Sequence, residues 1–156
     1  MNHEQAANEQ YVGLDVSLDT TSICVIDAKG AITWRGKCLS NPDAITQAVH
    51  QRAPDAVRVG LETGQLSNWL TLALRRRKLP VICLDARHAK AALSLQINKT
   101  DANDALGLAQ IVRAGWYREV AVKSMDAHTL RLLLVAPAQL VSQRQRAERR
   151  LLAGQR

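Results

Sequence analysis

Short extended runs, rich in apolar and β-branched residues, follow one another through the first forty positions of the chain. Residues 11–18 and Thr20–Asp27 each predict a strand, and a Lys29-Gly30 turn leads to a third strand over residues 31–39. Consecutive strands joined by such short turns pair side by side. The pattern therefore predicts an antiparallel three-stranded meander.

Helical and extended patterns alternate from residue 41 to residue 115. Helices are predicted over residues 43–52, from Ser67 to the basic cluster at residues 75–78, over residues 86–95 and over Asp101–Ala114, and strands over residues 57–61 and Val81–Leu84. Ser67 is the expected N-cap of its helix, and Pro80 and Gly115 follow predicted helix ends. The order βββαβαβαα predicts an α/β fold in which helices flank a mixed sheet.

The pattern changes after residue 122. Leucines from Leu130 to Leu140 predict a long C-terminal helical segment, which Pro137 is expected to kink or break. We therefore divide the chain into a polar tail over residues 1–10, one α/β domain over residues 11–122 and a helical extension over residues 123–156.

The chain is strongly basic, with 21 lysine and arginine residues against 14 acidic ones and a net charge of +7. Such an excess favours a polyanion, above all nucleic acid, as partner. The alternative is that the first basic cluster only complements the negative end of a helix. Aromatic residues make up only 3% of the chain, which argues against a single-strand binder built on stacking. The candidate contacts are Arg75, Arg76, Arg77 and Lys78, then Arg87, His88 and Lys90, and finally Lys99.

No segment of the sequence has the character of an export signal or a membrane span. Residues 1–10 are polar, and no apolar run approaches the roughly 20 residues that a membrane helix needs. We therefore expect a soluble intracellular protein. Cys24, Cys38 and Cys83 are widely spaced in apolar runs, which predicts buried free thiols. Trp116 is expected in the hydrophobic core.

Four acidic residues stand out by their positions. Asp15 interrupts the apolar run of the first strand, where a charge is costly unless it is paired or binds a metal. Glu62 ends the fourth strand. Asp101 and Asp104 are three residues apart and therefore share one face of the helix that they open. Carboxylates suit hard divalent cations, which support phosphodiester cleavage, so the set predicts a metal site.

Each acid also has a purely structural interpretation. Asp101 and Asp104 are favoured residue types at the start of a helix. Glu62 would be an ordinary residue at a strand end. Asp15 would pair with a basic neighbour, because buried acids are seldom unpaired. The presence of all four in one chain favours the metal site.

Four ordered motifs carry a family resemblance. They are Val12-Gly13-Leu14-Asp15-Val16-Ser17, Gly60-Leu61-Glu62-Thr63-Gly64, Asp85-Ala86-Arg87-His88-Ala89-Lys90 and Asn98-Lys99-Thr100-Asp101-Ala102-Asn103-Asp104-Ala105. In this order they resemble the DEDD-type transposases of insertion-sequence family 110. The similarity runs from about residue 11 to residue 143, and four ordered motifs are more specific than any single one.

The resemblance implies a RuvC-like, RNase H-like domain over residues 11–122. It also implies that Asp15, Glu62, Asp101 and Asp104 bind Mg²⁺, with Mn²⁺ as an alternative ion. The implied partners are DNA, a structured guide RNA and further copies of the protein, near the nucleoid of the bacterial cytoplasm. Family members carry a C-terminal domain with a serine nucleophile, so we expect this chain to match the N-terminal half and to be incomplete as a recombinase.

Two other classes of function stay open. A non-catalytic nucleic-acid-binding or dimerisation module, left from a truncated transposase, would use the basic clusters and the helical extension rather than the acids. An ATP-binding protein of the actin and sugar-kinase type would also have an acid followed by serine, as in Asp15-Val16-Ser17. That fold needs two such halves and a glycine-rich nucleotide loop, which 156 residues of this sequence do not offer.

Overall fold

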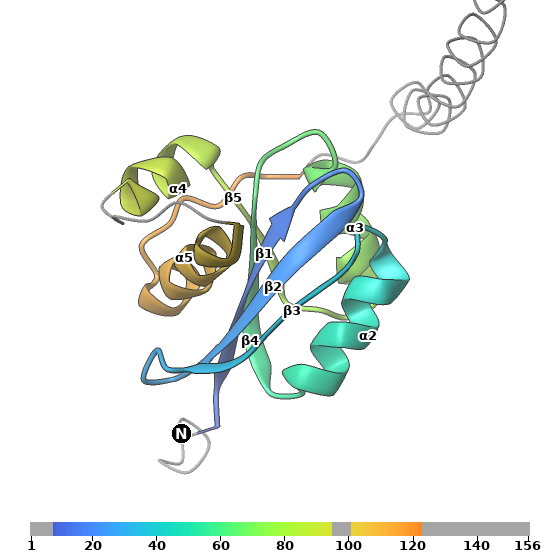
Figure 1. The fold of residues 1–156 in the computed structure, drawn as a ribbon. Helices are drawn as coiled ribbons and strands as arrows, with labels where there is room; N and C mark the ends of the chain where they lie inside the picture. The colour runs from blue at the N-terminus through green and yellow to red at the C-terminus, as the bar shows by residue number, and fades with distance from the viewer. Residues whose placement is uncertain (1–7, 95–100, 123–156) are drawn as a thin grey trace, which may run out of the picture. The chain divides into compact units, whose positions relative to one another are not determined.

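The protein folds around a five-stranded mixed sheet (Figure 1). The computed structural model describes residues 8–94 and 101–122. β1 pairs antiparallel with β2, and β2 with β3, whereas β1, β4 and β5 are parallel. This confirms the predicted meander and the mixed sheet. In spatial order the strands are β3 (Ile32–Leu39), β2 (Thr20–Asp27), β1 (Gln10–Val16), β4 (Ala56–Glu62) and β5 (Val81–Leu84).

Helices cover both faces of the sheet. One face is covered by α2 (Pro42–Arg52) and α3 (Ser67–Arg76), and the other by α5 (Asp101–Ala114), with α4 (Ala86–Leu93) beside it (Figure 1). Side chains alternate along a strand. Val12 and Leu14 of β1 therefore join the core under α2 and α3, whereas Tyr11 packs in the core under α5. None of the described helices is long and apolar enough to cross a membrane.

α5 packs closely on the strands beneath it. Ala105 lies over Gly13 in the middle of β1, where a Cβ atom on residue 13 would overlap the Ala105 carbonyl oxygen. Further along the helix, the Gln110 amide donates a hydrogen bond of 2.9 Å to the Gly30 carbonyl. Gly30 follows the end of β2, which pairs with the start of β1. α5 therefore runs antiparallel to β1.

The first strand is shorter than the sequence predicted. β1 ends at Val16 rather than at residue 18. The Ser17 amide donates to the Thr20 carbonyl at 3.0 Å, which closes a tight turn, and Leu18 on this turn is 65% exposed. The apolar side chain of Leu18 made the run look longer than the strand.

Three side-chain predictions were wrong. Ser67 is not a cap but the first residue of α3, and its hydroxyl donates to the Gly64 carbonyl. Trp116 is 81% exposed rather than in the core, because Gly115, with φ of 76°, ends α5 just before it. Cys24 and Cys83 are buried free thiols as predicted, but Cys38 is only half-buried, since β3 is an outer strand. The predicted helical extension over residues 123–156 lies outside the described residues.

Candidate metal centre and nucleic-acid interface

Asp15 and Glu62 are neighbours at one edge of the sheet. In the parallel pairing of β1 and β4, Leu14 lies opposite Leu61, and the next residues along the two strands are Asp15 and Glu62. Adjacent strands are about 4.8 Å apart, and side chains alternate between the two faces. Both acids therefore lie on the face of Gly13, which is the α5 side, and both residues are half-buried.

The N-terminus of α5 lies at the same edge. The helix begins at Asp101 and runs antiparallel to β1, so the turn that precedes Ala105 lies beside the end of β1 that carries Asp15. Asp104 belongs to this turn and is half-buried. The side chain of Asp101 lies outside the described part of the chain. The topology thus brings the backbone positions of the four predicted acids to one end of the strands. This end of the sheet, defined by Asp15, Glu62, Asp101 and Asp104, is called the acid edge.

The chemistry of the four acids fits a hard divalent ion, because Mg²⁺ and Mn²⁺ prefer oxygen ligands. Among the side chains that the structure describes, no three histidine, cysteine or acidic residues lie close enough to share one ion. Asp101 is not among these side chains. Asp15 and Glu62 both have interaction partners within the chain, so neither is an unpaired charge. Metal binding by the four acids therefore stays a prediction.

A cleft of 290 Å³ opens beside Glu62, between the turn after β1 and the loop after β4. The loop is braced by Ser67, whose hydroxyl accepts from the Gly64 amide at 3.0 Å and donates to the Gly64 carbonyl at 2.8 Å. Glu62 lines the cleft, whereas Val16 and Leu61 belong to the α3 side of the sheet, so the cleft opens toward the start of α3. The cleft is lined by Val16, Ser17, Leu18, Leu61, Glu62, Thr63, Gly64, Gln65, Leu66 and Ser67.

One of the two basic clusters lies at the acid edge. Leu84 at the end of β5 is opposite Glu62, so α4, which follows β5 directly, begins at this edge. Arg87 and His88 are exposed in the first turn of α4. Nucleic-acid contact by these two residues stays a prediction. Two further predicted contacts, the side chain of Lys90 and the whole of Lys99, lie outside the described part of the chain.

The other basic cluster lies toward the opposite end of the sheet. The Arg75 guanidinium donates to the carbonyl of Val81, the first residue of β5, at 3.0 Å and to the Glu119 carboxylate at 2.9 Å. Val81 pairs with Val59, three residues before Glu62. At about 3.3 Å per residue, this start of β5 is about 10 Å from the acid edge.

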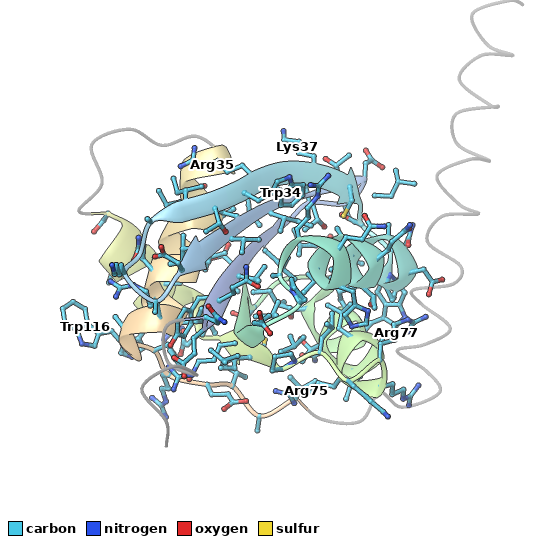
Figure 2. The ribbon with its side chains drawn as sticks, turned by 90° about the horizontal axis from the view of Figure 1, so that it is seen from below. Trp34, Arg35, Lys37, Arg75, Arg77 and Trp116 are labelled. Atoms are coloured by element: carbon cyan, nitrogen blue, oxygen red, sulfur yellow. The ribbon has the colours of Figure 1, made fainter. Side chains whose placement is uncertain are left out.

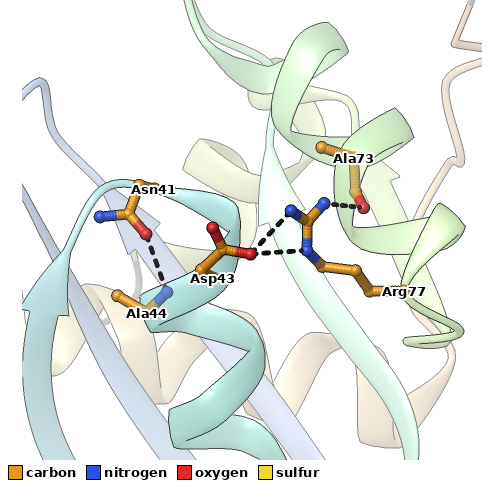
Figure 3. Close-up of polar contacts among 5 residues, drawn as sticks. All are labelled: Asn41, Asp43, Ala44, Ala73 and Arg77. Carbon is orange, nitrogen blue, oxygen red and sulfur yellow. Dashed lines mark hydrogen bonds and ion pairs between the residues drawn. The ribbon is translucent and has the colours of Figure 1, made fainter.

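Arg77 in the same cluster also has partners within the protein (Figure 3). Its guanidinium donates to the Asp43 carboxylate at 2.7 Å, which joins α3 to α2, and to the Ala73 carbonyl at 3.0 Å. The alternative from the sequence, that this cluster complements a helix end, therefore describes Arg77. Arg76 and Lys78 are exposed, and nucleic-acid contact by the cluster stays a prediction.

The buried thiols take no part in this site. Burial raises the pKa of both Cys24 and Cys83 above the ordinary value of 9.0. Both side chains are completely buried, so near neutral pH each is a protonated thiol within the core. The nucleophile of any reaction at the acid edge therefore comes from elsewhere.

Comparison with known proteins identifies the family. The family model described as Transposase, of the DEDD type named for IS110, matches residues 12–154. The chain belongs to this transposase family. No curated protein matches the sequence significantly. Family membership confirms the resemblance that the four motifs carry.

Several solved structures are similar to this domain. Thermus thermophilus RuvC matches with a TM-score of 0.51 at 12% identity, over 71% of this chain and 99% of RuvC. The same RuvC in complex with a Holliday junction substrate matches with a TM-score of 0.47 at 14% identity, over 72% and 99%. A ROK hexokinase from Thermus thermophilus matches with a TM-score of 0.43 at 18% identity, over 60% of this chain and 39% of the hexokinase. The match to RuvC at a TM-score of 0.51 shows that this domain has the RuvC-like, RNase H-like fold.

Sequence reasoning missed two exposed cations on the α5 side of the sheet. Arg35 and Lys37 lie on β3, and neither was among the predicted contacts. They stand at alternate positions of a predicted strand, which places both on one face. This alternation was visible in the sequence, but the position of that face beside Asp15 depends on the strand order.

Proposed function

We propose that the chain is the RuvC-like catalytic domain of a DNA transposase, in which Asp15, Glu62, Asp101 and Asp104 bind Mg²⁺ or Mn²⁺. The main support is the parallel register of β1 and β4, in which the first two acids follow a matched pair of leucines. α5 runs antiparallel to β1, which brings its N-terminus to the same end of the sheet. This direction supports assigning Asp101 and Asp104 to the same metal site. Membership of the transposase family supplies the reaction class, which is DNA strand cleavage and transfer.

The strands, α5 and α4 would each contribute to binding the DNA and the divalent ion. Paired strands hold Asp15 and Glu62 on a rigid scaffold, which keeps their carboxylates aligned with the bound phosphodiester. The positive end of the α5 dipole adds attraction for the phosphate. Arg87 and His88 would contact the backbone next to the acids without reading its sequence. A divalent ion at the acids would activate the attacking oxygen and stabilise the leaving oxygen.

From the family resemblance alone we propose three further properties. They are a structured guide RNA as partner, assembly with further copies of the protein and a location near the bacterial nucleoid. The complete recombination cycle is proposed to need the serine-bearing C-terminal domain that family members carry. Without such a second domain, the domain described above is not expected to complete strand transfer.

Thermal unfolding with and without Mg²⁺ or Mn²⁺ tests the metal site. A ligand at about 100 times its dissociation constant stabilises a fold by about 2.7 kcal/mol. We expect the metal to raise the melting temperature of the parent chain, and the rise to be lost in Asp15→Asn and in the double variant Asp101→Asn with Asp104→Asn. Asp55→Asn is the matched control, because Asp55 is exposed before the start of β4, away from the acid edge.

A second function is favoured by the absence of a three-ligand group among the described side chains. In this function the domain is a non-catalytic DNA-binding or dimerisation module. It predicts no metal response in the parent, and equal or higher melting temperatures in the acid variants, because like charges are removed. Asp15→Asn would then bind DNA as tightly as the parent, with or without Mg²⁺. That combination of results would overturn the metal-dependent proposal.

A further inference from the structure

A row of paired residues crosses the α5 face of the sheet from the acids to the outer strand β3. Asp15 of β1 is opposite Ser22 of β2, and Ser22 is opposite Lys37 of β3. In the neighbouring row, Cys24 is opposite Arg35. Paired residues of antiparallel strands have their side chains on the same face. Arg35 and Lys37 therefore share the face that carries Asp15.

Within the described residues, the β3 part of this face carries exposed side chains. α5 packs on β1, β2 and β4, whereas α2 packs against the other face of β3. Trp34 points to the α2 side, where its ring lies 5.3 Å from the Arg52 guanidinium. Arg35 and Lys37 are exposed along β3 (Figure 2), and neither forms an ion pair with a described residue. A hollow of 210 Å³ lies beside them.

The spacing of the two cations suits a nucleic-acid backbone. Two strand intervals of about 4.8 Å place the Cα atom of Lys37 about 10 Å from that of Asp15. Arg35 and Lys37, two residues apart in β3, are separated by about 7 Å. The first interval crosses the strands and the second follows β3, so the Cα atom of Arg35 lies about 12 Å from that of Asp15. Both long cationic side chains could therefore reach phosphates that flank a bond held at the acids.

We propose that Arg35 and Lys37 form a phosphate-binding strip for the DNA strand whose scissile bond lies at the acids. The strip rests on the proposed function, because it needs DNA at that edge. Both residues are cations that contact phosphates, so the strip sets the position of the strand and not its sequence preference. The competing explanation is that these charges only protect the open edge of β3 from pairing with other chains.

Salt-dependent binding of a linear DNA duplex to the full 156-residue chain separates the two explanations. Each lost phosphate contact lowers the slope of log K against log salt by about 1. We expect R35Q/K37Q to lower the slope by about 2 and to raise Kd roughly tenfold at moderate salt. The charge-preserving variant R35K/K37R should keep most of the parent slope. K29Q/R52Q removes the same charge from two exposed residues, in the turn after β2 and at the end of α2, that lie at the opposite end of the sheet and are not predicted contacts, and it should change the slope little.

Any result other than these contradicts the phosphate-binding strip. An unchanged slope in R35Q/K37Q, or an equal loss in K29Q/R52Q, leaves only a diffuse charge effect. A loss that appears with an RNA duplex and not with DNA assigns the cations to RNA. If the parent binds no DNA at all, the strip and the DNA substrate fail together. The effect of metal on the melting temperature is measured without DNA. If R35Q/K37Q leaves DNA binding unchanged while the metal still raises the melting temperature, only the strip is contradicted and the metal site keeps its support.

Discussion

The carbonyl oxygen of Ala105 in α5 lies where a side chain on Gly13 of β1 would have to be. The helix therefore rests on the backbone of the strand rather than on a layer of side chains. The same contact sets the height of α5 above the sheet, and the turn that carries Asp104 directly precedes it. Gly13, two residues before Asp15, thus links the packing of the core to the position of the acid edge.

Gly13→Ala should therefore destabilise the domain and displace α5. The added methyl would overlap the Ala105 carbonyl oxygen and lie 2.6 Å from the Ala109 amide nitrogen, and neither backbone atom can turn aside as a side chain would. Overpacking of this kind costs about 1 to 3 kcal/mol, and we expect a value at the upper end. Urea unfolding measures the loss, and the metal-dependent rise in melting temperature should shrink with it.

Gly64→Ala is the matched control for this change. A Cβ atom on Gly64 would meet no atom within 4 Å, so its free energy of unfolding should stay within about 0.5 kcal/mol of the parent. Equal stability of the two variants would show that α5 is free to lift from the sheet, and would contradict the proposed role of Gly13.

Most of the fold was predictable because its signals are local. Thr20–Asp27, Val81–Leu84 and Asp101–Ala114 have the predicted bounds, since β-branched runs, Pro80 and Gly115 mark their ends. The predictions were wrong where contacts between distant segments determine whether a residue is buried. Trp116 was expected in the core from its apolar character, but no property of the residue itself shows that the chain leaves the core after Gly115.

The candidate site was predictable only in part. The unusual positions of Asp15 and Glu62 in apolar strands were visible in the sequence, and their neighbouring positions follow from the parallel register of β1 and β4. That register depends on contacts between segments that are distant in the sequence, and neither segment alone determines it. For the same reason the sequence did not separate Arg75, which has partners within the protein, from the exposed Arg87.

The ion pair between Arg77 and Asp43 should add little stability. The two side chains meet at 2.7 Å, but that of Asp43 is 85% exposed, so water screens the charges. A double-mutant cycle with Arg77→Met and Asp43→Asn should give a coupling energy of about 0.2 to 1 kcal/mol, falling further at high salt. A coupling well above 1 kcal/mol that persists in salt would show that the pair holds α2 against α3.

Ser67→Ala should loosen the loop that borders the cleft. The hydroxyl bonds both the amide and the carbonyl of Gly64, and Ser67 is only 5% exposed. Gly64 itself is exposed and its carbonyl keeps the hydrogen bond from the Ser67 amide, so water replaces part of what is lost. We expect a cost of about 1 kcal/mol in urea unfolding. Ser94→Ala, which removes an exposed hydroxyl bonded to the Ala91 carbonyl, is the control and should change stability by less than about 0.5 kcal/mol. Equal losses would contradict the bracing role of Ser67.

The two buried thiols should weaken the fold in alkaline solution. Burial raises the pKa of Cys24 and Cys83 above 9.0 in the folded chain. Below this pH the thiols are protonated in both states and favour neither. Above it the unfolded chain loses protons first, so the unfolded state binds fewer protons and the free energy of unfolding falls as pH rises.

The double variant Cys24→Ala with Cys83→Ala should therefore lose stability less steeply than the parent between about pH 8 and about pH 10. The cavities left by the two substitutions lower its stability at every pH, so the slopes must be compared rather than the absolute values. Burial also raises the pKa of Tyr11, and this residue contributes equally to both slopes because both proteins contain it. Parallel curves for the two proteins would mean that the thiols ionise alike in the folded and unfolded chains, and that the core admits a thiolate at no cost.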